Sequence, residues 1–214
     1  MRSRKGLIYN IGINDANYPV QINENTGDIF PSGKKKQKVV WRCPFYNRWT
    51  GMIERCYSLK WRKKYSTYKG CTVCKSWLTF SNFRKWMITK DWEGKELDKD
   101  LLVEGNKIYS PTTCIFIDQK INKFVLEQLK RKGEFLIGCS WSKQHKRFKA
   151  NCNNTFTKKY EFLGYFDSET EAHLAWKERK HELACQLANS EYVTDPRLAR
   201  VLRIRYENYT EVEN

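Results

Sequence analysis

The chain has 214 residues, enough for one large domain or two small ones. Its 40 Lys and Arg residues against 24 Asp and Glu give a net charge of +16, which favours a polyanionic partner and nucleic acid before any other. No apolar run is long enough to cross a membrane, no signal peptide is present and no basic amphipathic helix stands out. We therefore expect a cytoplasmic protein without a membrane partner.

Residues 1–40 read as an N-terminal arm with one hairpin. The turn chemistry falls at Asn23–Asp28, and the lysine-rich stretch Pro31–Lys38 reads as an exposed linker. Two interpretations of that stretch stay open, a mobile solvated tail and a phosphate contact.

Two helices are expected next. Pro44 suits a first helical turn, and apolar residues recur at helical spacing after it, so the first helix is predicted at Pro44–Tyr57. The second is predicted at Trp77–Trp86, where a stripe of aromatic residues indicates a side that faces the core.

A strand, a loop, a strand and a helix follow in that order. The strands are predicted at Glu96–Val103 and Thr113–Ile117, with a turn at Glu104–Lys107 between them. The helix is predicted at Asp118–Leu129, with Asp118 as its N-cap.

The pattern changes after residue 130. Three short strand segments, at Phe135–Trp141, Arg147–Asn153 and Tyr160–Tyr165, precede a helix that Ser168 and Glu171 open as a capping box. We therefore predict an α+β chain in four parts: an arm at 1–40, a strand–strand–helix unit at 41–130, a small three-stranded antiparallel sheet packed on one helix at 133–190, and a tail at 191–214.

The stretch LDKDLLVEGNKIYSPTTCIFIDQKIN, residues 97–122, combines several groups that bear chemistry. Asp98 and Asp100 share one face of the predicted strand, and two carboxylates on one face favour a hard divalent cation such as Mg²⁺. This stretch, within residues 40–125, resembles the HNH endonuclease family and in particular its phage-type homing endonucleases. The resemblance implies a ββα-metal fold for residues 41–130 and a divalent cation, Mg²⁺ or Mn²⁺, as cofactor.

The resemblance also implies roles for single positions. Asp98 takes the place of the first metal ligand, and Asn122 takes the place of the ligand on the helix. Lys99 falls at the position of the general base, and Thr113 falls near the asparagine that braces this base.

This half of the chain departs from the family because it contains no histidine. A charged lysine cannot accept a proton, so Lys99 would instead stabilise the charge that develops on the phosphate. Asp100 or Tyr109 would then act as base or position the attacking water.

Cys71 and Cys74 form a C-x-x-C pair, which is half of a common zinc-ribbon arrangement. In a cytoplasmic protein, cysteines are better explained as metal ligands or core thiols than as disulfides. A four-thiolate zinc site would add Cys56 and Cys114 to the pair. The alternative is that Cys56 and Cys114 are buried free thiols, since both occupy positions suited to apolar residues.

The C-terminal half resembles the ethylene-response-factor type of DNA-binding domain over residues 133–190. The matching residues are Gly138, Trp141, Arg147, Phe148, Ala150, the run Leu163–Asp167, Glu171 and Ala172. In that family the sheet lies in the major groove of DNA, as in other β-sheet readers. The resemblance implies that double-stranded DNA contacts Trp141, Lys143, Arg147, Lys149 and Asn151. Alternation places the last three on one face of their strand, opposite Phe148 and Ala150.

These features predict a metal-dependent DNA endonuclease of the homing type, targeted by a C-terminal DNA-binding sheet and cutting one or both strands. The alternative is a catalytically inactive DNA-binding protein or regulator on the same scaffold. A third hypothesis, an RNA-binding zinc protein, predicts bound zinc and a preference for single strands.

Overall fold

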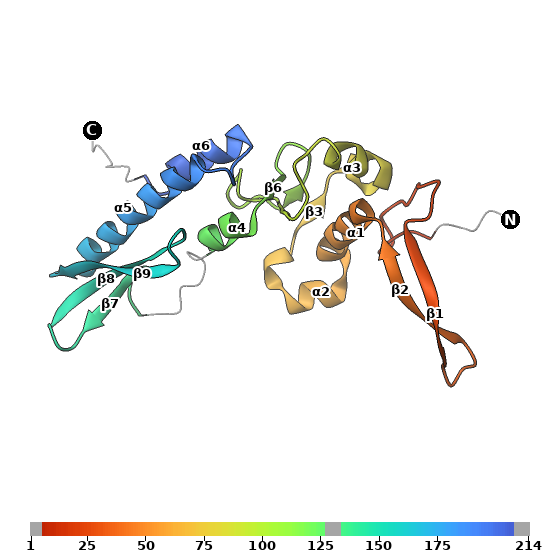
Figure 1. Cartoon of the computed structure of the whole chain (residues 1–214), viewed down its shortest axis with the longest axis horizontal. Coiled ribbons are helices and arrows are strands. Elements are labelled where there is room, and N and C mark those ends of the chain that lie inside the picture. The colour runs from red at the N-terminus through yellow and green to blue at the C-terminus, as the bar shows by residue number, and fades with distance from the viewer. Residues whose placement is uncertain (1–5, 127–133, 208–214) are drawn as a thin grey trace. The chain divides into compact units, whose positions relative to one another are not determined.

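The computed structural model describes residues 6–126 and 134–207 (Figure 1). Contacts divide the chain into two compact units, one of Met1–Trp92 with Leu97–Phe116 and the other of Glu93–Glu96 with Ile117–Asn214. Both helices and small sheets are present, so the chain is α+β as predicted. Across the described ranges, no helix has the length and apolar character that a membrane span requires.

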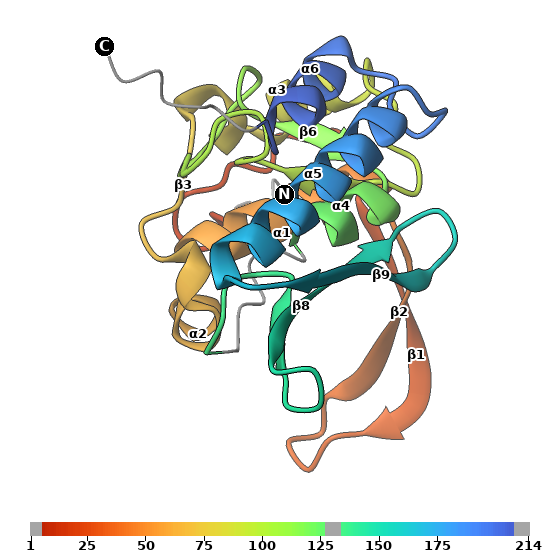
Figure 2. The same cartoon turned by 90° about the vertical axis from the view of Figure 1, so that its left-hand side faces the viewer.

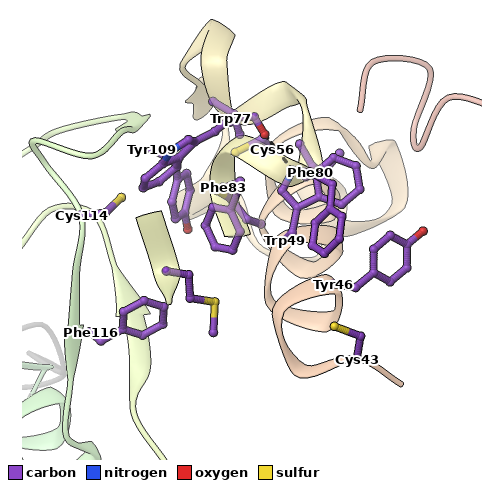
Figure 3. Close-up of a cluster of buried hydrophobic side chains, with 14 of the residues drawn as sticks. Cys43, Tyr46, Trp49, Cys56, Trp77, Phe80, Phe83, Tyr109, Cys114 and Phe116 are labelled. Atoms are coloured by element: carbon purple, nitrogen blue, oxygen red, sulfur yellow. Dashed lines mark hydrogen bonds between the residues drawn. The ribbon is translucent and has the colours of Figure 1, made fainter. Parts of the chain in front are cut away.

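The core of the first unit forms around α1 (Pro44–Tyr57), whose bounds match the prediction. Trp49 is fully buried on α1, and its indole Nε1 donates to the Trp77 carbonyl at 2.7 Å. Aromatic rings surround it, with Trp49 and Phe80 centroids 5.5 Å apart (Figure 3). This core fixes the helices on which the rest of the unit is built.

The predicted helix Trp77–Trp86 is wrong over its first three residues. The structure has a 3-10 turn, η2 (Lys75–Leu78), then an extended residue, Thr79, and only then α3 (Phe80–Met87). Ile13 explains the break, because its N–H donates to the Leu78 carbonyl at 2.7 Å and its carbonyl accepts from Phe80 N–H at 3.0 Å. A tertiary strand-like pairing therefore interrupts a locally helical pattern.

The arm prediction is right about a hairpin and wrong about its turn. β1 (Gln21–Ile29) and β2 (Lys35–Arg42) pair antiparallel, and Phe30 N–H donates to the Lys34 carbonyl at 2.8 Å across the turn. Gly27, inside the turn predicted at Asn23–Asp28, has φ +87° and lies where the strand register shifts. The glycine therefore supplies a bulge, and the predicted linker forms the turn and part of β2.

Short elements complete the first unit. α2 (Leu59–Lys64) and η1 (Ser66–Tyr68) lead into β3 (Thr72–Val73), which pairs in parallel with β5 (Ile108–Tyr109). β4 (Glu96–Asp98) pairs with β6 (Ile115–Ile117). The predicted strand Glu96–Val103 is too long, because the chain turns directly after Asp98.

The second unit contains the predicted sheet packed on one helix. β7 (Cys139–Ser142), β8 (Arg147–Asn154) and β9 (Lys159–Phe166) form an antiparallel sheet, and α5 (Glu169–Ala188) packs on one face (Figure 2). The capping box of Ser168 and Glu171 is confirmed.

α4 (Gln119–Leu126) and α6 (Pro196–Ile204) belong to the same unit. Asp118 accepts the Lys120 N–H at 2.6 Å, as expected of the helix cap. The predicted helix end at Leu129 lies outside the described residues.

Candidate nucleic-acid interface and the loop after β4

Asp98 holds the turn that ends β4. Its Oδ1 atom accepts two backbone N–H groups, from Asp100 at 2.9 Å and from Leu101 at 2.7 Å. Burial raises the pKa of this carboxyl, although both hydrogen bonds favour its charged form. The side chain proposed as a metal ligand therefore organises the backbone of this loop.

Lys99 is buried, with 6% of its surface exposed. Its Nζ atom donates to Asp100 Oδ2 at 2.9 Å and to the Asn106 carbonyl at 3.1 Å. Burial opposes the charge, but the hydrogen bond and negative charge of Asp100 outweigh it and raise the pKa of Lys99. Lys99 is therefore a charged member of an ion pair, which does not suit the role of general base.

Asn106 is the residue of this loop that sequence reasoning missed. Its Nδ2 atom donates to the carbonyls of Lys99 at 2.6 Å and Ile108 at 2.8 Å, and its Oδ1 atom accepts the Ile108 N–H at 3.2 Å. Thr113, placed by resemblance near the bracing asparagine, donates to the same Ile108 carbonyl at 2.8 Å. Asn106 therefore ties the two ends of the loop together, and its Gly-Asn turn was the available signal.

We expect Asn106→Ala to lower the free energy of unfolding of the first unit by about 1–3 kcal/mol, because three backbone groups lose their partner. Chemical denaturation measures this change. Asn82→Ala is the matched control, since Asn82 makes one hydrogen bond, to the Ser76 carbonyl at 3.0 Å, at an exposed position. Equal losses in both variants would show that Asn106 does not hold the loop.

The remaining residues of the predicted cutting site, Asn122 and Tyr109, each make a hydrogen bond to a different partner. Asn122 belongs to the second unit, and its amide donates to the carboxylate of Glu96 in the same unit. Tyr109 accepts a hydrogen bond from Arg55 Nε at 3.1 Å, and burial raises its pKa, so the phenol stays protonated. Asp98 and Asp100 each use one carboxylate oxygen within the protein, Oδ1 of Asp98 and Oδ2 of Asp100.

The four cysteines of the predicted zinc site are free thiols, and three of them are buried. Burial raises the pKa of Cys56 and of Cys114 to about 12, so both thiols are protonated in the metal-free protein. Within 6–126 and 134–207, no cluster of three or more His, Cys, Asp or Glu residues is arranged to hold a metal ion. The interpretation of Cys56 and Cys114 as buried core thiols agrees with these positions.

The sheet of the second unit has one face against α5, and the described residues of the unit leave its other face open. Ala150, Cys152 and Asn154 of β8 are buried, and they alternate with Arg147 and Lys149 on the other side. The structure therefore confirms the predicted alternation. The open face carries Ser140, Ser142, Arg147, Lys149, Asn151, Asn153, Tyr160, Phe162 and Tyr165.

An aromatic row crosses this open face, which sequence reasoning also missed. Tyr165 stacks on His145 with ring centroids 4.2 Å apart and meets Phe162 edge-on at 5.0 Å. Tyr160 follows on the same strand with 78% of its surface exposed. A register shift after Ala150 brings Tyr165 to the face of Phe162, so simple alternation along β9 does not place both.

The predicted DNA-contacting residues lie in three places: on the open face, in the β7–β8 turn and on the opposite face of the sheet. Arg147 Nε donates to Asp167 Oδ1 at 2.8 Å, and Lys149 Nζ lies 5.4 Å from the Phe162 ring centroid. Lys143 is exposed in the β7–β8 turn. Trp141 pairs with Phe148 and so points to the opposite face, where it is partly exposed.

A cavity of about 870 Å³ opens at the end of the sheet. Three lysines line it, Lys120 and Lys123 from α4 and Lys158 from the β8–β9 turn. Asn153 and Tyr160 of the open face also line this cavity, so a cationic hollow continues the face.

Comparison with protein-family models, with curated proteins and with solved structures finds no match for this chain. The chemistry of the two sites is therefore the basis for inferring the function.

Proposed function

We propose that this chain is a double-stranded DNA-binding protein and that the open face of β7–β9 contacts the DNA. The observation that supports the proposal is the combination, on one uncovered sheet face, of Arg147 and Lys149 with asparagines and a row of aromatic rings. The ion pair between buried Lys99 and exposed Asp100 supports this function over catalysis, because Lys99 occupies the position of the general base.

The groups on this face match the chemistry of a duplex. Arginine and lysine contact phosphates or the O6 and N7 atoms of guanine, and asparagine pairs with adenine. Apolar and aromatic side chains contact thymine methyl groups, and strands fit the width of the major groove. The net charge of +16 adds a long-range attraction to any duplex.

We expect Lys149→Gln to weaken binding and to reduce the slope of log K against log salt by about 0.9, the value for one lost phosphate contact. Fluorescence anisotropy with a labelled duplex at several salt concentrations measures both. Lys177→Gln removes the same charge from α5 and serves as control. Slopes equal to that of the wild type in both variants would contradict the proposal.

Endonuclease activity is the second candidate, and one observation favours it. Asn106 ties the loop after β4 to Ile108, as the resemblance to HNH endonucleases requires of a bracing asparagine. The carboxylates of this loop are the groups that a cutting site would use.

Asp98→Asn distinguishes the two candidates, because the amide oxygen still accepts the two N–H groups of the turn while the charge is lost. We expect plasmid DNA with Mg²⁺ or Mn²⁺ to stay uncut with the wild type and with Asp98→Asn alike. Nicking by the wild type that the variant loses, with equal DNA affinity, would establish the endonuclease instead.

A further inference from the structure

The hairpin of β1 and β2 has almost no buried surface. Apart from Val20 and the half-buried Gln21 and Lys36, all residues from 20 to 42 are exposed. A two-stranded ribbon is at best marginally stable in water when it stands alone. Figure 1 shows both strands extending beyond α1 of their own unit, so the described part of this unit leaves both faces of the ribbon uncovered.

Polar cross-strand contacts give this ribbon its shape in place of a core. Arg42 donates from Nη2 to Gln21 Oε1 at 2.6 Å, and Gln37 donates to Asn25 Oδ1 at 3.3 Å. The turn closes between Phe30 and Lys34, with Gly33 at φ +77°. These contacts and the turn define how the two strands of the ribbon pair.

The charge of the ribbon is concentrated on β2 and the turn. No acidic residue occurs from Phe30 to Arg42, and this stretch carries Lys34, Lys35, Lys36, Lys38 and Arg42. β1 contributes two acids, of which Asp28 lies 3.8 Å from Lys36. A positive surplus on an exposed ribbon is complementary to a polyanion.

The end of the ribbon is apolar. Ile29 is 62% exposed and Phe30 is 48% exposed, and Pro31 follows in the turn. The ribbon therefore has a positively charged edge on β2 and an exposed apolar tip.

We propose that the β1–β2 hairpin is a second DNA-binding arm, which lies in the major groove of a duplex with the lysines of β2 against phosphates. This inference rests on the proposed function. The major groove is about 12 Å wide and admits a two-stranded ribbon. Nine extended residues span roughly 30 Å, nearly one helical turn of DNA.

The test removes three charges from the arm, as Lys35→Gln, Lys36→Gln and Lys38→Gln in one full-length chain. Salt-titrated binding of a labelled duplex is expected to lose about 2.7 from the slope of log K against log salt, or about 0.9 per lysine. The control chain carries Lys69→Gln, Lys75→Gln and Lys85→Gln, exposed lysines of the same unit, and keeps the wild-type slope. The net charge of the two chains is equal, so long-range attraction is matched.

An arm variant with the slope of the control overturns the inference. If Lys149→Gln lowers the slope in the same assay while the arm variant does not, DNA binding by the sheet is supported. Only the proposal that the β1–β2 hairpin binds DNA is then overturned. A wild-type chain that binds no duplex overturns both proposals.

Discussion

Gly138→Ala is expected to unfold the second unit or to leave it barely stable. Gly138 precedes β7 with φ +85°, a conformation that residues with a side chain rarely adopt. A Cβ atom there would lie 2.1 Å from Cγ and 2.4 Å from Cδ1 of Trp176, a buried ring of α5. Neither the backbone nor the tryptophan can give way without separating the sheet from its helix.

Backbone strain and overpacking together predict a loss of about 2–5 kcal/mol in the free energy of unfolding. Gly94→Ala is the control in the same unit, since Gly94 has φ +70° but an added Cβ atom would meet nothing within 4 Å, and only strain of about 1–2 kcal/mol is expected. Urea denaturation followed by near-ultraviolet circular dichroism measures both. Equal midpoints for the two variants would mean that Trp176 does not pack against Gly138.

Arg147→Ala is expected to cost about 1–3 kcal/mol of duplex binding, a loss of roughly 5–150-fold in affinity, and to relax sequence selectivity. The Arg147–Asp167 ion pair is solvent-exposed, at 44% and 82% of the two side chains. It adds little stability, but it orients the guanidinium on the open face. Loss of this side chain therefore affects recognition more than folding.

Arg147→Lys separates charge from geometry, because lysine keeps the charge without the planar pair of donors. We expect it to restore part of the affinity and little of the selectivity, as measured with duplexes of varied sequence. Arg200→Ala, at an exposed position on α6, is the control for loss of a positive charge. Full selectivity in Arg147→Ala would show that this arginine reads no base.

Local signals were enough to predict several elements. Pro44 and the apolar spacing after it gave α1, and Ser168 with Glu171 gave the start of α5, because caps and periodicity act within a few residues. Prediction from the sequence fails where the backbone conformation depends on contact with a distant segment of the chain. Thr79 is extended because Ile13 pairs beside it, and no local pattern contains that partner.

In the candidate sites, too, local sequence patterns predict only the features that local structure determines. Alternation along β8 placed Arg147 and Lys149 correctly, since the period of a strand is fixed. The aromatic row of β9 cannot be predicted from alternation, because a register shift decides which face its rings occupy. The sequence predicts Asn106 only as a turn residue, and the folded loop shows which carbonyls its amide reaches.

A titration of the chain with duplex DNA, followed through the NMR signals of its aromatic rings, tests whether the open face of β7–β9 binds DNA. We predict that the signals of the Tyr160, Phe162 and Tyr165 rings shift as the duplex binds, while the signals of the buried Trp176 ring stay unchanged. Saturation with DNA that leaves the three open-face rings unchanged would contradict the assignment of this face to DNA.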